Sequence, residues 1–105
     1  MAKTFTIRIG DKIHKAVTVS GLAEIMGLSP HTIRKYEARK ILPPANYRLP
    51  SKNTAFTQVG RRVYLLATAE KLRDLFKEKV RQGVPMSEEV KVEIKQIFAK
   101  ELNAT

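Results

Sequence analysis

The sequence predicts a mainly helical α+β fold for a chain of 105 residues. Two stretches near 4–9 and 12–19 alternate apolar and polar residues, which is the period of half-buried strands. Four later stretches place apolar residues three and four apart, which is the period of amphipathic helices. The length suffices for one compact core and is too short for two, so we expect a single domain over 1–105.

An N-terminal β-hairpin is expected over 1–19. Gly10 and Asp11 separate the two alternating stretches, and Gly followed by a short polar residue suits a hairpin turn. The apolar positions of the alternation are Phe5, Ile7 and Ile9 in the first stretch and Ile13, Val17 and Val19 in the second.

A short helix is expected next, over 21–26. Ser20 is its candidate N-cap, because a Ser hydroxyl accepts a hydrogen bond from the free N–H groups of a first turn. Gly27 ends this helix, since Gly readily adopts the left-handed conformation of a helix end. Ala23 is small enough for a second helix to cross closely.

That second helix is expected over about 30–40. Ser29 caps it, and Pro30 suits a first helical turn, which needs no proline N–H. Pro43-Pro44 prevents its continuation. With Ile33 facing inward, the two helices and their turn have the spacing of a helix-turn-helix, although an ordinary helical hairpin with a solvated basic face remains the alternative.

The rest of the chain is predicted to hold a loop or loose hairpin over 45–61, a strand over 61–66, and a helix over 69–82 capped by Thr68. An amphipathic C-terminal helix over 87–102 follows, with Ser87 as its N-cap. Packing on the domain's own core is the preferred role of this helix, and a dimer contact is the alternative.

Positive charge is concentrated in the middle of the chain. The whole chain has 20 Lys and Arg against 10 Asp and Glu, a net charge of +10. Residues 31–62 alone have eight Lys and Arg against Glu37, a net charge of +7. Solubility needs no such concentration, so a polyanion such as DNA or RNA is the better explanation.

Several classes of function are disfavoured by composition. The chain has no Cys and two His, so we expect no disulfide, no metal site and no cofactor. No nucleophile–base pair or glycine-rich phosphate loop is visible, so an enzyme is the least favoured class. The chain has neither a long apolar run nor a signal peptide, so we expect no membrane contact and a cytoplasmic location, associated with a bacterial nucleoid or encoded by a virus or plasmid of a prokaryotic host.

The second helix carries the candidate contacts to a nucleic acid. Base-edge contacts concentrate at the N-terminal end of a recognition helix, which makes His31, Thr32 and Lys35 the candidates for groove contacts. Arg34 and Arg39 are expected to hold phosphates, which positions the protein without reading sequence.

The segment "VTVSGLAEIMGLSPHTIRKYEARKILPP" resembles the N-terminal winged helix-turn-helix of the MerR family. Residues 32–37 match the family's "TLRYYE" helix, and residues 41–44 match its "GLLPP" exit. The resemblance covers roughly 17–82. It implies a wing after the second helix, with Arg48 and the pair Arg62-x-Tyr64 in the family's positions.

The same resemblance implies that Arg34 and Tyr36 contact phosphates from the helix, and that Arg48 and Arg62 do so from the wing. Basic wing residues such as Lys52 are expected in a minor groove or on the backbone. The complete predicted interface is Ser29, His31, Thr32, Arg34, Lys35, Tyr36, Arg39, Lys40, Arg48, Lys52, Arg61 and Arg62.

Three departures from the family narrow the expectation. The segment between Arg48 and Arg62 is longer than the usual wing, the N-terminal hairpin is additional, and the dimerising coiled coil and effector domain are absent. A small excisionase-like, phage-repressor or small-terminase type of relative is therefore expected, without inducer sensing. The predicted parts are a hairpin (1–19), a winged helix-turn-helix core (20–82) and a C-terminal helix (83–105).

Double-stranded DNA is the expected partner, and a small transcriptional regulator with some sequence preference is the leading interpretation. An architectural role in phage or plasmid recombination, packaging or partition is the first alternative. An RNA-binding module is the second, although few aromatic residues are present for stacking on bases. A homodimer through the C-terminal helix or the N-terminal hairpin is an open possibility, since two copies read a longer site than one.

Overall fold

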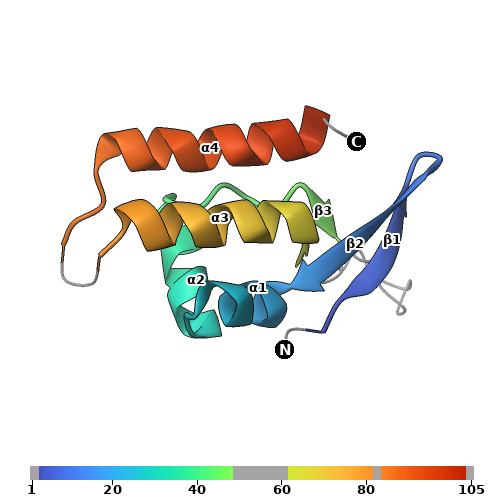
Figure 1. The fold of residues 1–105 in the computed structure, drawn as a ribbon, viewed down its shortest axis with the longest axis horizontal. Coiled ribbons are helices and arrows are strands. Elements are labelled where there is room, and N and C mark those ends of the chain that lie inside the picture. Colours follow the sequence, from blue (N-terminus) through green and yellow to red (C-terminus); the bar gives the residue numbers. More distant parts are fainter. Residues whose placement is uncertain (1–2, 49–61, 82–83, 104–105) are drawn as a thin grey trace.

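The computed structural model describes residues 3–48, 62–81 and 84–103. Within these ranges it contains four helices and a four-stranded antiparallel sheet, which confirms the predicted mainly helical α+β fold. The elements are β1 (Phe5–Ile9), β2 (Lys12–Thr18), α1 (Val19–Met26), α2 (Pro30–Ala38), β3 (Tyr47–Arg48), β4 (Arg62–Leu65), α3 (Leu66–Lys79) and α4 (Glu88–Asn103). Figure 1 shows α3 between α4 and the α1–α2 pair, with the sheet at one end of the helices.

The N-terminal hairpin is part of the same sheet as the later strands. The strand order is β1-β2-β4-β3, and β2 pairs with β4 so that Val17 lies opposite Tyr64. On the other side of β4, Arg48 of β3 lies opposite Arg62. The sheet therefore connects the hairpin directly to the strands that carry two of the predicted phosphate contacts.

One face of the sheet packs on the helices. Val17 and Tyr64 belong to the main core, and α4 adds Val90, Ile94 and Phe98 to it. This confirms the expectation that the C-terminal helix packs on the domain's own core. The opposite face has a smaller cluster formed by Ala16, Val63 and Leu65, with Phe5, Ile7, Ile9 and Tyr47 partly buried against it.

The alternation predicted for β2 is wrong at its outer end. Ile13 is 72% exposed, although it lies on the same face of the strand as buried Val17. The hairpin extends beyond the helices, as Figure 1 shows, so the helical layer covers this face only near Val17. The periodicity of the sequence predicted the strand, but it could not show how far the packing helices extend along it.

Two predicted helix caps are also corrected. α1 begins at Val19, and its N-cap is Thr18, whose hydroxyl accepts a hydrogen bond from the Gly21 N–H at 3.4 Å, in place of Ser20. α3 begins at Leu66 with no capping side chain of its own, while Thr68 is buried inside its first turn.

A carboxylate from α4 accepts a hydrogen bond at the start of α3 instead. Glu101 of α4 is only 5% exposed, and its Oε2 accepts a hydrogen bond from the Leu65 N–H at 3.1 Å. Its Oε1 accepts one from Asn46 Nδ2 at 2.9 Å, just before β3 begins. One side chain therefore ties α4 to both the β4–α3 junction and the segment that leads into β3.

Helix ends differ from the sequence expectation by two or three residues. α2 ends at Ala38 before Lys40, which has a left-handed φ of 61°. α3 ends at Lys79, and the next residue, Val80, is extended. The cap predicted at Ser87 is confirmed, since its hydroxyl accepts a hydrogen bond from the Val90 N–H at 3.3 Å.

Candidate nucleic-acid interface

A tight turn sets the angle between α1 and α2. Gly27 has a φ of 71°, and its N–H returns to the carbonyl groups of Ala23 and Glu24 at the end of α1. Ser29 then caps α2, because its hydroxyl accepts a hydrogen bond from the Thr32 N–H at 3.1 Å. Both ends of the turn agree with the sequence prediction, so the position of α2 follows from local signals.

The exposed side of α2 presents basic residues. Ile33 is fully buried beneath the helix, while His31, Arg34 and Lys35 are exposed. These three lie three and four residues apart and therefore share one face of the helix. The Thr32 hydroxyl lies 2.9 Å from the Ser29 hydroxyl at the start of the same helix. Both groups therefore lie at the end of the helix that is expected to meet base edges.

Three arginines from different elements line one pocket. Arg34 comes from α2, Arg48 from β3 and Arg62 from β4, and they surround a volume of about 480 Å³. The pocket also includes Thr18, Val19 and Ser20. We call this site the arginine pocket. Its three arginines are three of the four residues that the resemblance assigned to phosphates, and the fourth, Tyr36, does not line it.

The N-terminal end of α1 forms the remaining wall of the arginine pocket. The first N–H groups of a helix and its dipole favour an anion at this end. No acidic side chain occupies the first turn of α1. The helix end thus adds to the positive potential that the three arginines create.

Two of these arginines face each other across the sheet. Arg48 and Arg62 are direct partners in the β3–β4 register. Like charges directly opposite each other destabilise a pair of strands. Glu37 reduces this cost, because its Oε2 lies 2.6 Å from Arg62 Nη1 in a partly exposed ion pair.

Arg62 also lies near Tyr64, which is two residues further along β4 and therefore on the same face of the sheet. The Tyr64 side chain is almost fully buried, and the Arg62 charge acts on its hydroxyl group. Burial raises the pKa of the Tyr64 hydroxyl, the Glu37 carboxylate raises it further, and Arg62 opposes both. Arg62 therefore reaches the pocket from a position set by Glu37 on one side and Tyr64 on the other.

Other predicted contacts lie elsewhere. The Tyr36 ring packs on the Phe76 ring of α3 at 5.9 Å between centroids. Arg39 lines a different pocket together with Tyr36, so the structure separates it from Arg34. Lys40 lines a groove between the end of α2 and α4. Lys52 and Arg61 lie outside the described residues.

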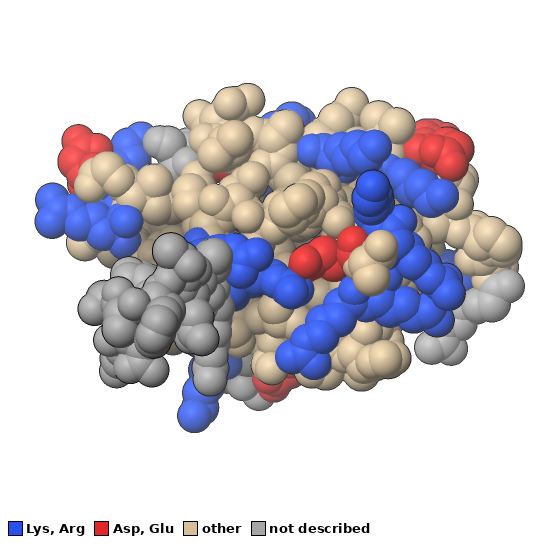
Figure 2. Space-filling model, turned by 180° about the vertical axis from the view of Figure 1, so that it is seen from behind, with Lys and Arg blue, Asp and Glu red and all other residues tan. Residues whose placement is uncertain are grey.

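Figure 2 shows one face of the molecule, on which Lys and Arg side chains gather around a small acidic area. Sequence reasoning missed three contributors to the arginine pocket: Thr18, Ser20 and the ion pair of Glu37. The sequence did contain a signal for Thr18 as a helix cap, since Thr18 precedes a run of helix-compatible residues as Ser20 does. The ion pair depends on how β4 packs beside α2, and no local pattern encodes that.

In the described ranges, no group of three His, Asp or Glu side chains converges in the way metal ligands do. Over the same ranges, none of the helices combines the length and apolar character that crossing a bilayer requires. Comparisons of the chain with known protein families, with curated proteins and with solved structures gave no match.

Proposed function

We propose that this protein binds double-stranded DNA as a winged helix-turn-helix, with α2 as the recognition helix and the β3–β4 segment as the base of the wing. One observation carries the proposal. Arg34, Arg48 and Arg62 converge from three elements on the N-terminal end of α1, where they form a site for a phosphate. A duplex whose backbone occupies this pocket brings the exposed face of α2 to its major groove.

The arrangement divides the interface into two roles. The arginine pocket holds backbone phosphate and contributes affinity without sequence information. His31 and Lys35, exposed on the outer face of α2, are the candidates for base-edge contacts. A small transcriptional regulator is the function that this division fits best, because occupancy of a promoter by such a domain is enough to block it.

The test is fluorescence anisotropy with labelled duplex DNA of mixed sequence over a range of salt concentrations. With four to seven phosphates contacted, log affinity should fall against log salt with a slope of roughly −4 to −6. Arg34→Ala and Arg62→Ala should each weaken binding roughly tenfold and lower the slope by about 1. Lys71→Ala is the matched control, because Lys71 is an exposed base on α3 outside the arginine pocket.

Two results would overturn the proposal. A flat salt response, or normal binding by both arginine variants, would remove the phosphate site. Tighter binding to duplex or single-stranded RNA of the same sequence would support the RNA-binding alternative instead. Selection of bound duplexes from a random pool should recover a motif, and Lys35→Ala should relax it at particular positions by about 1–3 kcal/mol.

A further inference from the structure

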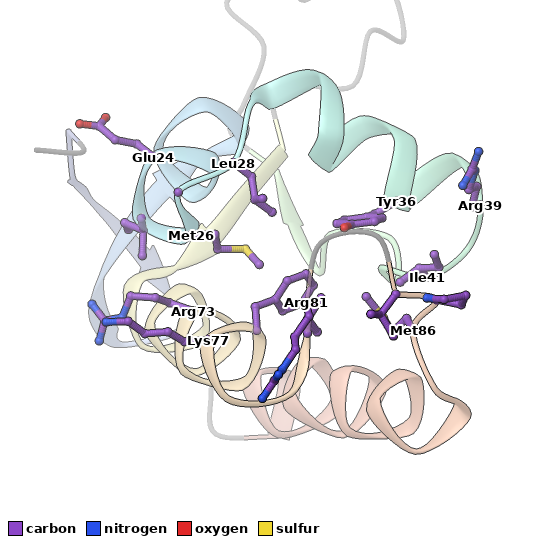
Figure 3. A pocket seen from close by; sticks show the side chains of 16 residues that line it. Glu24, Met26, Leu28, Tyr36, Arg39, Ile41, Arg73, Lys77, Arg81 and Met86 are labelled. Carbon is purple, nitrogen blue, oxygen red and sulfur yellow. The ribbon is translucent and has the colours of Figure 1, made fainter.

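A second pocket, which shares no residue with the arginine pocket, lies between the end of α1, α2, α3 and residues 84–86 (Figure 3). Its volume is about 630 Å³. We call it the Met26 pocket. It accounts for Arg39, which the DNA-binding interpretation leaves apart from the other predicted phosphate contacts.

The interior of the Met26 pocket is apolar. Its walls include Met26, Leu28, Tyr36, Phe76, Val80 and Met86. In Figure 3, Met26, Leu28 and Tyr36 point toward the interior. Methionines are flexible and polarizable, and they are common on surfaces that accept another protein's apolar side chains. This pocket therefore offers both apolar area and the capacity to adjust to a partner.

The edge of the same pocket is strongly basic. Arg39 lies on one side, and Arg73 and Lys77 lie on the other, with Arg81 following the end of α3 (Figure 3). Glu24 is the one acidic side chain among the described residues that line it. Arg73 has an exposed partner in Asp74 at 3.1 Å, a kind of pair that contributes little. Arg39, Lys77 and Arg81 form no ion pair with any residue in the described ranges.

The spacing of these cations favours an extended ligand over a small one. Arg73 and Lys77 are four residues apart on α3, which is roughly 6 Å along the helix axis, and Arg81 lies beyond the end of the helix. A single carboxylate engages one or two cations of such a row. A ligand with several acids along its length can engage both sides of the pocket while its apolar side chains enter it.

We propose that the Met26 pocket docks an acidic amphipathic helix of a partner protein. The apolar stripe of that helix lies against Met26, Tyr36 and Phe76, and its flanking carboxylates face the basic edge. Charge complementarity identifies this occupant, since the pocket is apolar within and cationic on both sides. The site is independent of the proposed DNA contact, so a partner can be held beside bound DNA.

The probe is a labelled peptide of about four helical turns, with Leu at three- and four-residue spacing and Glu on both flanks. Fluorescence anisotropy with the full chain should show saturable binding. Arg73→Glu combined with Lys77→Glu should weaken it about tenfold or more, because two attractive contacts become repulsive. Lys71→Glu, on the same helix and outside the pocket, is the matched control and should change affinity less than about twofold.

Peptide variants test the apolar contacts without altering the protein's fold. Replacing each Leu of the peptide by Ser should abolish binding; retained affinity would mean that charge alone attracts the peptide and would overturn the proposal. Equal loss in the Arg34→Ala variant would place the peptide in the arginine pocket and would also overturn it. Since no DNA is present in this assay, its outcome stands apart from that of the DNA-binding test.

Discussion

Glu101→Ala tests whether one buried carboxylate holds the C-terminal helix to the rest of the fold. Glu101 is 5% exposed and accepts hydrogen bonds from the Leu65 N–H at 3.1 Å and from Asn46 Nδ2 at 2.9 Å. Truncation leaves the Leu65 N–H without this acceptor in a buried position, since Leu65 is 7% exposed. The amide of Asn46 keeps its bond to the Phe98 carbonyl at 2.9 Å.

The expected loss in the free energy of unfolding is about 3 kcal/mol. A buried donor left without a partner costs roughly 1–3 kcal/mol, and a hydrogen bond to a charged group contributes about 1.5–3 kcal/mol. The remaining bond of Asn46 to Phe98 limits the second contribution to the lower end of its range. For a domain with a total stability of about 5–15 kcal/mol, this is a large fraction.

Urea unfolding followed by circular dichroism measures this loss. With a slope of about 1–1.5 kcal/mol per molar urea, the midpoint should fall by about 2–3 M. Gln96→Ala, at an exposed position on the same helix, is the control and should cost less than about 0.5 kcal/mol. A loss below about 1 kcal/mol for Glu101→Ala would refute the reasoning. A double-mutant cycle with Asn46→Ala should show a coupling energy of about 1 kcal/mol.

Three further changes probe the turn, the pH response and the interface. Gly27 has a φ of 71°, and no atom lies within 4 Å of a Cβ added there, so backbone strain sets the cost of a side chain at this position. Gly27→Ala should therefore lower the free energy of unfolding by roughly 1–2 kcal/mol in a thermal unfolding experiment. Gly27→Asn should lower it less, because Asn adopts the left-handed conformation more readily. Equal losses for Gly27→Asn and Gly27→Ala, or no loss for Gly27→Ala, would contradict this reasoning. Tyr64 has a pKa above its ordinary value of 10.0 in the fold, so the folded state holds this proton more tightly than the unfolded chain. The stabilisation that this proton provides is complete below pH about 10 and is lost as the pH rises toward the raised pKa. Tyr64→Phe should therefore make the alkaline decline in the free energy of unfolding shallower, and an unchanged profile would contradict this. Glu37→Gln removes a negative charge beside Arg62 and should raise DNA affinity a few-fold at low salt, with the difference shrinking as salt screens it; weaker binding at every salt concentration would mean that Glu37 is needed to hold Arg62 in place.

Local signals predicted the elements that position α2. Ser29 and Pro30 mark its start because capping depends on side chains within one turn, and Gly27 marks the preceding turn because a left-handed residue is needed there. The hairpin was predicted for the same reason, since strand alternation and its turn residues are adjacent in the chain. Arg34, Arg48 and Arg62 were named individually from the resemblance, but nothing in the sequence showed that they share one pocket.

The errors arise where distant segments meet. Thr68 looked like the cap of α3, yet Glu101, 36 residues after Leu65, accepts the hydrogen bond at that junction. Exposed Ile13 fitted the alternation of β2, but the extent of the helical layer decided its burial. Arg39 has the right residue type for a phosphate contact, and its flank of α2 faces α3 instead of the arginine pocket.

The arginine pocket is more easily explained as a binding site than as a device for stability. Placing Arg48 opposite Arg62 costs free energy in a two-stranded ladder, and Arg34 adds a third like charge to the same pocket. The ion pair between Glu37 and Arg62 is itself partly exposed, so its contribution to stability is modest. In the proposed function, a backbone phosphate would lie among these three arginines, beside the N-terminal end of α1. Under that proposal, the anion would offset the repulsion among the arginines, which is the expected relation between a locally unfavourable arrangement and a functional site.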